Sequence, residues 1–482
     1  MSPATSPASN RRWWALGLIA VAQFVVIMDT SIIGVALPEM QTDLGFAPED
    51  LSWVFNAYVV AFGGLLLLGG RLSDLLGARK VFIAGWAVLL AGSVVAGAAG
   101  NEAVELVGRA VQGAGAALVA PSALTLLMVL FAGNGKELTK ALALYGAAAP
   151  AGGTAGVFLG GVLTEYASWP WVFYVNIPIA LAVIAAAPRV MPDVPGSRGG
   201  HDWVGAATVT GGLAALVYAI VRAPEVGWAS AQTLLVGAGA LALLGLFLVV
   251  QAKSRHPLVR LGIFRTPALG AANVAQFLLG AAWVPMWFFL NLYLQQVLGL
   301  SAFPSGSALL PMTVFIMAGM VLVAPRVIAR FGPKRALVTG MGVLAVGLGL
   351  LALVRPDGSY VVDVLPASLV AAAGMSLAFI PSLGIALSSA RPEEGGLAAG
   401  IVNTSYQVGS ALGLAAMTAV AAANGADQLG DVSSLTDGYS AAFLGAAVLA
   451  AVGAVIAAVT LRLPKPKPQP QAADADTEAV AA

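Results

Sequence analysis

Long apolar runs of roughly twenty residues alternate with short polar stretches along almost the whole chain. Because a helix that crosses the core of a bilayer needs about 20 apolar residues, each run predicts one membrane span. Cutting the runs at charged or Pro/Gly-rich breaks gives about fourteen spans. The spans begin near Trp13, Leu51, Val81, Ala103, Leu138, Trp171, Trp203, Ala231, Pro267, Pro304, Ala336, Val361, Leu397 and Tyr439.

The composition also indicates a membrane protein. Of the 482 residues, 59% are hydrophobic and 10% are charged, whereas about a quarter of the residues in a soluble domain are charged. Cysteine is absent, which excludes disulfides and thiol catalysis. The two histidines, His201 and His256, fall in polar connections, so we expect no metal site. The predicted fold class is therefore an all-α integral membrane protein.

Basic residues are distributed unevenly between the two sides of the predicted membrane. Of the 24 Lys and Arg residues, only Arg222 and Arg355 fall in the connections on one side, and Arg109 falls inside a span. Cytoplasmic loops carry an excess of Lys and Arg, and an even number of spans places both termini on one side. We therefore expect a multi-pass protein of the bacterial cytoplasmic membrane with both termini in the cytoplasm. The opposite connections hold Glu39, Asp43, Glu49, Asp50, Glu102, Asp427, Asp431 and Asp437.

The two ends of the chain differ from the apolar runs. The first run follows "MSPATSPASNRRWW" and is too long for a cleaved secretory signal, so we expect a retained first span. Residues 463–482 are rich in Pro and Ala and have no apolar face to bury. They predict a disordered cytoplasmic tail.

An internal repeat suggests how the spans are grouped. "GGRLSDLLGARKVFIAG", after the second span, is echoed by "VAPRVIARFGPKRALVTG" after the tenth. Two six-helix halves separated by an inserted pair of helices would place the echo there. We therefore predict an N-terminal half over 1–190, two inserted helices over 191–262 and a C-terminal half over 263–462. Related halves are the usual construction of secondary transporters.

Four stretches contain polar residues and glycines in a recognisable order. They are "MDTSIIGVALP" in the first span, "GRLSDLLGARK" after the second, "GRAVQGAGAALVAPS" in the fourth and "GAAAPAGGTAGVFLGG" in the fifth. "SWPWVFYVNIPI" and "NTSYQVGSALG" occur later in the chain. Any one of these alone is weak, but together they are specific.

With these motifs the chain resembles the major facilitator superfamily, and within it the fourteen-span drug:proton antiporters of the multidrug efflux type. The resemblance runs from about Trp13 to Leu461 and implies drug export driven by proton entry. The matching positions are Asp29, Thr30, Ala36, Pro38, Gly70, Leu72, Asp74, Gly77, Arg79, Arg109, Gln112, Gly113, Gly115, Gly146, Gly152, Gly156, Gly160 and Gly161. The chain departs from the family pattern at Leu75 and Ala78, where basic residues are usual, and at Gly153 and Val157, where prolines are common.

Asp29 and Arg109 are the candidate proton-coupling residues. Asp29 lies about 24 Å along the first span and Arg109 about 10 Å into a span that runs inward, so their depths are compatible. Each charge is costly in a membrane unless it is paired or hydrated. We expect Asp29 to be the only carboxylate deep within a span and to carry the proton, with Arg109 as the fixed charge. The alternative is a permanent structural ion pair.

The stretch "GRLSDLLGARK" supplies a candidate gating loop, formed by Gly70, Asp74, Gly77 and Arg79. Asp74 precedes the third span and can neutralise the positive end of that helix or pair with Arg79. A plain solvated turn is the alternative reading. The echo in the second half has Ala329 at the position that matches Asp74, so a latch would be present on one half only.

Two further groups of residues are candidates for packing and for substrate binding. Gly146, Gly152, Gly156 and Gly160 recur at helical spacing along the fifth span and predict close helix packing. Polar and aromatic residues inside other spans suggest an amphipathic substrate cavity, with packing or interfacial anchoring as the alternative. The candidates are Trp53, Asn56, Tyr58, Gln112, Asn273, Gln276, Asn403, Tyr406 and Gln407.

The sequence therefore predicts a proton-coupled antiporter that exports drug-like or antibiotic-like molecules. No GxxxxGK[ST] nucleotide-binding motif occurs, and we expect no cofactor beyond the proton gradient. An exporter of a metabolite, siderophore or lipid is the first alternative. A membrane sensor or enzyme is less favoured because no catalytic constellation is visible. The expected partners are a small-molecule substrate, protons and the lipid bilayer, without nucleic acid, and we expect a monomer.

Overall fold

The computed structural model describes residues 7–46, 53–196, 202–254, 257, 262, 267–300, 302–390, 395–426, 428 and 430–462. The regular structure of these residues is helical throughout. The helices of the first part are α1 (Pro7–Ser31), α2 (Ile33–Leu44), α3 (Trp53–Leu76), α4 (Ala78–Gly97), α5 (Glu102–Phe131), α6 (Gly135–Tyr166), α7 (Trp171–Tyr174), α8 (Asn176–Val190), α9 (Trp203–Val226) and α10 (Ala231–Lys253).

The second part of the chain contains several short π-helical segments that continue α-helices. Its elements are α11 (Pro267–Leu292), η2 (Tyr293–Val297), α12 (Ala302–Ala308), α13 (Leu310–Ala318), η3 (Gly319–Val323), α14 (Ala324–Phe331), α15 (Pro333–Leu351), η4 (Tyr360–Val364), α16 (Leu365–Ser388), α17 (Gly395–Ala421), η6 (Ala422–Ala426) and α18 (Val432–Thr460). The predicted disordered tail, 463–482, and both histidines lie outside the described residues.

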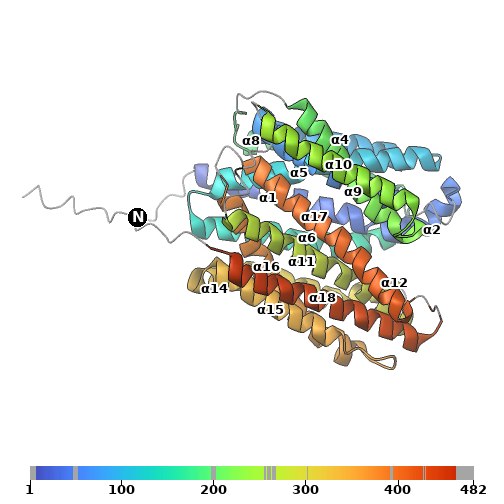
Figure 1. The fold of residues 1–482 in the computed structure, drawn as a ribbon. Helices are drawn as coiled ribbons and strands as arrows, with labels where there is room; N and C mark the ends of the chain where they lie inside the picture. Colours follow the sequence, from blue (N-terminus) through green and yellow to red (C-terminus); the bar gives the residue numbers. More distant parts are fainter. Residues whose placement is uncertain are drawn as a thin grey trace, which may run out of the picture.

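The helices lie side by side in one elongated bundle (Figure 1). In this view α4, α5, α8, α9 and α10 lie on one side, α14, α15, α16 and α18 lie on the other, and α6, α11 and α17 lie between them. The most extensive contacts within the first part join α4 to α5, α3 to α5, α1 to α6 and α9 to α10. Those in the second part join α15 to α16 and α11 to α17, while α3 packs against α17 across the bundle.

Within the described residues, thirteen helical segments are long and apolar enough to cross a membrane, and some of them join adjacent elements, such as α7 and α8. Val204–Ile220, within α9, is a shorter apolar helix, and it is the segment on which the predicted fourteenth span depends. Most helices begin within a few residues of the predicted starts, but α18 begins at Val432 rather than near Tyr439. The chain is an all-α, multi-pass membrane protein.

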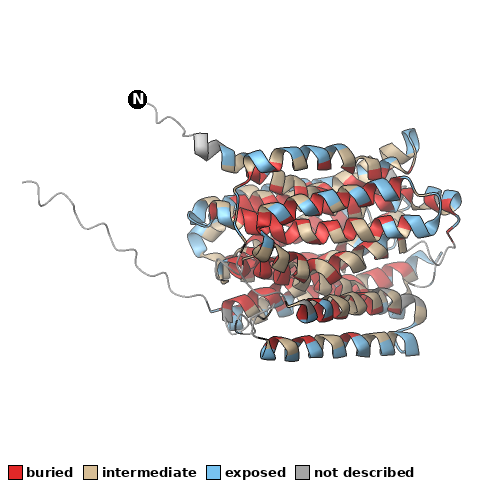
Figure 2. Cartoon of the chain, turned by 90° about the horizontal axis from the view of Figure 1, so that it is seen from above, coloured by how far each residue is buried: buried red, intermediate tan, exposed pale blue. Residues whose placement is uncertain are grey.

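The burial pattern fits a bundle surrounded by lipid. Buried residues concentrate where helices face one another, and exposed ones on the outer faces (Figure 2). Many of the exposed side chains are large and apolar, as expected where the surroundings are lipid tails rather than water. Examples are Leu234, Leu235, Leu241, Val314, Val455 and Val459.

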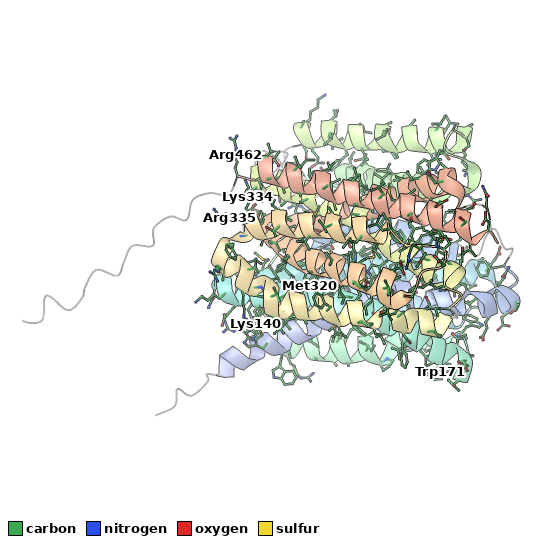
Figure 3. The ribbon with its side chains drawn as sticks, turned by 90° about the horizontal axis from the view of Figure 1, so that it is seen from below. Lys140, Trp171, Met320, Lys334, Arg335 and Arg462 are labelled. Carbon is green, nitrogen blue, oxygen red and sulfur yellow. The ribbon has the colours of Figure 1, made fainter. Side chains whose placement is uncertain are left out.

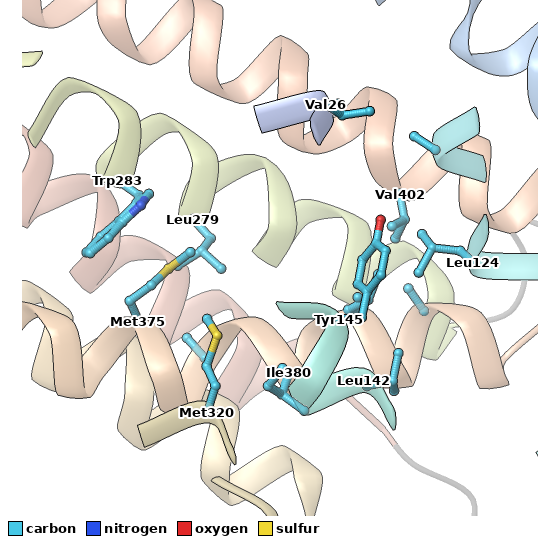
Figure 4. Packing of buried hydrophobic residues seen from close by; sticks show 14 of the residues in the cluster. Val26, Leu124, Leu142, Tyr145, Leu279, Trp283, Met320, Met375, Ile380 and Val402 are labelled. Atoms are coloured by element: carbon cyan, nitrogen blue, oxygen red, sulfur yellow. The ribbon is translucent and has the colours of Figure 1, made fainter. Parts of the chain in front are cut away.

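The middle of the bundle is closed by side chains from both parts of the chain. Tyr145 on α6 has Leu124 and Val402 on one side, and Ile380 and Met320 lie toward its opposite side (Figure 4). Tyr145 is 2% exposed, and Met320 and Ile380 are 1% exposed. The two parts therefore meet through an apolar core along α6.

Basic side chains gather at one end of the bundle, as the charge asymmetry of the sequence predicts. Lys140, Lys334, Arg335 and Arg462 lie toward one end, and Trp171 lies toward the other (Figure 3). Arg12 also pairs with Glu137 across α1 and α6, with 2.7 Å between Nη2 and Oε1.

The cysteine-free chain allows the membrane topology to be tested with single cysteines at exposed positions. We expect Gly133→Cys and Ala252→Cys to react with a membrane-impermeant maleimide only after the cells are permeabilised, because they lie at the basic end predicted to be cytoplasmic. Gly100→Cys and Ala229→Cys should react in intact cells. If Ala229→Cys and Ala252→Cys react from the same side, α10 does not cross the membrane and the fourteen-span topology is wrong.

Candidate functional site

Asp29 and Arg109 form an ion pair in the interior of the bundle. Asp29 lies near the end of α1 and Arg109 lies in the second turn of α5, and both side chains have no exposed surface. Arg109 Nη1 donates to Asp29 Oδ2 at 2.8 Å. The contact that the two depths made possible is therefore present.

Amides and a hydroxyl from three other positions complete the surroundings of Asp29. Asn176, at the start of α8, donates from Nδ2 to Asp29 Oδ1 at 2.7 Å. Gln112, one turn after Arg109, donates from Nε2 to the same oxygen at 3.2 Å and to Ser93 Oγ at 2.8 Å. A buried polar group costs free energy unless it is hydrogen-bonded, and these contacts replace the hydration that Asp29 loses on burial.

Arg109 is held in place from several directions. Its Nε donates to the backbone oxygen of Val54 at 2.8 Å, and its Nη1 also donates to Gln112 Oε1 at 2.8 Å. The guanidinium lies over the ring of Tyr58, 4.7 Å from its centroid, and 5.9 Å from that of Phe173. The ion pair is therefore surrounded by α1, α3, α4, α5, α7 and α8. A flexible Lys in place of Arg109 would not reproduce these contacts.

Sequence reasoning missed three members of this site. Asn176 and Ser93 are polar residues within apolar runs and are both fully buried. Glu105, in the first turn of α5, also has no exposed surface. The burial of Glu105 was not predicted from the sequence, but this carboxyl lies one turn from the start of α5 and does not contradict the expectation that Asp29 is the only carboxylate deep within a span. The sequence signal that could have placed Glu105 near this site is its spacing, one helical turn before Arg109.

The residues predicted to line a substrate cavity are separated into three places. Tyr58 and Gln112 contact Arg109, as described above. Trp53, at the start of α3, packs against Tyr218 and Arg222 of α9, with ring centroids 5.4 Å apart for the aromatic pair. Asn56, also on α3, is 9% exposed.

The remaining cavity candidates lie on α11 and α17. Asn273 Oδ1 accepts a hydrogen bond from Ser405 Oγ at 3.1 Å, which joins the two helices. Tyr406 meets Phe379 of α16 edge to face, with centroids 6.1 Å apart. Asn403 donates to the backbone oxygen of Ala399, Gln276 is 1% exposed, and Gln407 is half-buried.

Asp74 contacts a different helix from the one that the sequence suggested. It lies in the last turn of α3 and accepts hydrogen bonds from the backbone N–H groups of Gly396 and Leu397, at 2.8 and 2.9 Å. The helix end stabilised by Asp74 is thus the start of α17, in the second part of the chain. Arg79 instead pairs with Asp193, with 2.9 Å between Nη2 and Oδ1.

Glycines allow the close approach that the Asp74 contact requires. A Cβ at Gly70 would collide with the backbone oxygen of Gly396, and a Cβ at Gly396 would lie 2.5 Å from Gly70 O. Gly77, between α3 and α4, has a φ of +96°, a conformation that favours glycine. The α3–α17 contact is therefore made backbone to backbone.

The glycine series on α6 has two different neighbours. Gly152, Gly156 and Gly160 face the backbone of the first helices, where added Cβ atoms would meet the carbonyl oxygens of Phe24, Met28 and Ile32. Gly146 instead faces Ile380, Met320 and Phe379 in the second part of the chain. Three of the four glycines therefore set the α1–α6 distance, and the fourth lies at the meeting of the two parts.

The comparisons with known proteins agree with this architecture. Residues 19–414 match the Major Facilitator Superfamily, and the chain belongs to that family. It is similar in fold to the human organic anion transporter MFSD10, with a TM-score of 0.66 at 16% identity over 92% of this chain and 99% of that one.

Two relatives are similar over nearly their whole length. The cephamycin export protein CmcT of Amycolatopsis lactamdurans is 38% identical over 449 residues, covering 92% of each chain. The puromycin resistance protein pur8 of Streptomyces alboniger is 34% identical over 471 residues, covering 95% of this chain and 93% of that protein.

The α1–α6 contact gives a matched pair of substitutions. Gly152→Ala should lower the free energy of unfolding by about 1–3 kcal/mol, because the new methyl group must displace the backbone of α1. Gly161→Ala, on the same helix, should leave it nearly unchanged, because nothing lies within 4 Å of its added Cβ. Thermal unfolding of the purified protein in detergent measures both. Equal unfolding temperatures would show that α1 and α6 are not held at this distance.

Proposed function

We propose that this protein is a proton-coupled antiporter that exports antibiotic-like small molecules from the bacterial cytoplasm. The observation that carries the proposal is the fully buried ion pair between Asp29, which can take up a proton, and Arg109, which cannot lose one at physiological pH. The curated relatives that export or resist antibiotics support the substrate class over a primary metabolite, siderophore or lipid.

Asp29 would couple the proton to the substrate by changing charge. When the site faces outward, a proton from outside neutralises Asp29 and weakens its hold on Arg109 or on a cationic drug. When the site faces inward, loss of that proton restores the carboxylate and its attraction for a cation. The gradient then drives export, because the proton binds on one side and leaves on the other.

The substrate would be bound between the two halves of the bundle. The supporting observation is that Phe379 of α16, which meets Tyr406 of α17 edge to face, also lies against Gly146 of α6 in the first half. Such surfaces suit large, partly apolar molecules. We place the two six-helix halves at 1–190 and 263–462, with residues 191–262 as the inserted pair.

The proposed arrangement in the cell follows the charge asymmetry. The protein would lie in the cytoplasmic membrane with both termini inside, and it would function as a monomer without a bound cofactor. The contact of Asp74 with α17 would then lie on the cytoplasmic side and hold that side closed in the conformation described. Gly70, Gly77 and Arg79 would shape this gate.

Substitution of Asp29 tests the coupling directly. Asp29→Asn should abolish proton-driven export, because the residue can no longer change charge, but should retain energy-independent exchange of substrate. Asp29→Glu should keep partial activity. The measurement is uptake of a panel of β-lactam, nucleoside and polyketide antibiotics by inverted membrane vesicles, with and without an imposed proton gradient.

The same vesicles identify the outcomes that would contradict the proposal. Uphill, proton-driven transport by Asp29→Asn at normal expression would leave Asp29 as a structural partner of Arg109. Transport by the unsubstituted protein that needs ATP but no gradient would exclude antiport.

The Asp74 contact predicts a shift between conformations. Asp74→Asn loses one of the two acceptor oxygens and the negative charge at the start of α17, at a cost of about 1 kcal/mol, so it should raise the cytoplasm-open population about fivefold. Thr125→Cys reports this change, since Thr125 is 7% exposed and lies against Gly395 at the start of α17. Its reaction with maleimide should accelerate in Asp74→Asn but not in Asp437→Asn, an exposed carboxylate outside this contact. An unchanged rate would reduce Asp74 to a helix cap without a gating role.

A further inference from the structure

Glu105 is a buried carboxyl that takes no part in the proton cycle proposed for Asp29. It has no exposed surface, and neither of its carboxylate oxygens has a hydrogen-bond partner among the described residues. An ionised carboxylate buried without a partner is much less stable than the neutral acid. We therefore expect Glu105 to be protonated in this conformation.

Arg109 has an unused donor in the same buried region. Its Nε and Nη1 are engaged by Val54, Asp29 and Gln112, whereas Nη2 has no hydrogen-bond partner within the described chain. Glu105 precedes Arg109 by four residues, which places both on one face of α5 one turn apart. A free carboxyl and the free side of a guanidinium are thus close to each other but unpaired.

The other charged and titratable groups around this region are already occupied or face elsewhere. Glu102, on α5, is exposed, and Arg222, on α9, lies over the ring of Trp53. The hydroxyls of Tyr58 and Tyr174 donate to the backbone oxygens of Val26 and Gly97. Arg109 is therefore the one cation facing Asp29 and Glu105 within the described residues. It can neutralise one carboxylate at a time, so the other must hold a proton.

We propose that Glu105 is a second proton-binding site, which exchanges its proton with Asp29 while Arg109 changes partner. In this step the O–H bond of Glu105 breaks and an O–H bond forms on Asp29. Arg109 then pairs through Nη2 with the Glu105 carboxylate. The site keeps one positive and one negative charge throughout, so no net charge is moved into the membrane interior.

This exchange deepens the proton cycle and rests on the proposed function of Asp29. Glu105 is three residues from the start of α5, at the end of the helix predicted to face outside, whereas Arg109 lies one turn further in. A proton arriving from outside would reach Glu105 first. Asp29 would then be protonated from within the protein.

Infrared spectroscopy tests the protonation state without any substrate. The purified full-length protein in lipid at neutral pH should show a carbonyl band of a protonated carboxyl that Glu105→Gln lacks. The matched control Glu102→Gln should keep the band. Asp29→Asn should also lose it, because Arg109 is then free to pair with ionised Glu105.

Two spectroscopic results would overturn the proposal. A spectrum unchanged by Glu105→Gln would mean that Glu105 is ionised already. A band that persists in Asp29→Asn would mean that Glu105 stays protonated whatever the partner of Arg109, so that no exchange occurs.

Transport provides an independent measurement. Glu105→Gln has the shape of the protonated acid but cannot become a carboxylate that pairs with Arg109. Asp29 then keeps Arg109 as its partner and should be harder to protonate. The dependence of export on external pH should shift by about one unit toward acid, as expected when a neighbouring charge is lost. Glu102→Gln should keep the original profile, and an unshifted profile in Glu105→Gln would refute the exchange. Absence of proton-driven export in the unsubstituted protein would instead refute the proposed function, and the infrared result would still report on Glu105.

Discussion

Arg109 and Asp29 meet where neither touches solvent, and this constraint determines how the surrounding helices must pack. Removing one partner of a buried ion pair typically costs about 3–5 kcal/mol, because the other charge is left uncompensated. Most of the remaining donors and acceptors are satisfied by the backbone oxygen of Val54 on α3, by Gln112 on α5 and by Asn176 on α8, whereas Arg109 Nη2 has no hydrogen-bond partner among the described residues. The ion pair can therefore exist only if these helices lie within hydrogen-bond distance of one another. In lipid, where apolar surfaces gain little by burial against each other, such contacts carry much of the specificity of packing.

Glycine makes these distances possible. A Cβ at Gly92 on α4 would lie 2.8 Å from Cγ of Gln112, so a larger residue there would separate Gln112 from Ser93. Gly108 and Gly115 play the same part on α5, where added Cβ atoms would meet the backbone of α4 at Ala96 and Leu89. The polar site and the glycine pattern are thus two aspects of one arrangement, since the side chains reach one another only because the backbones are close.

Much of this architecture could be predicted from the sequence, because apolar length and charge asymmetry are strong physical signals. The spans follow from the length of the apolar runs and the basic end of the bundle from the charge asymmetry, while the depths of Asp29 and Arg109 showed only that the two could meet. The partner of Asp74 could not be predicted, because it is the backbone of Gly396 and Leu397, more than three hundred residues away, and any sequence supplies backbone N–H groups. The burial of Glu105 was missed because a carboxyl in the first turn of a helix is usually exposed and stabilises the helix dipole. The places of Gln276 and Tyr406 depend on the relative position of two helices, which hydrophobic periodicity does not determine.

The contact between Gly70 of α3 and Gly396 of α17 has a kinetic consequence. Interfaces made by long side chains lose rotamer freedom when they form and must reorder each time they re-form. A glycine contact has no rotamers to lose, so α3 and α17 can separate and meet again as rigid bodies, with water replacing only a few backbone groups and the hydrogen bonds of Asp74. Closure of this interface therefore requires little side-chain reorganisation, which suits the gating role that we propose for it.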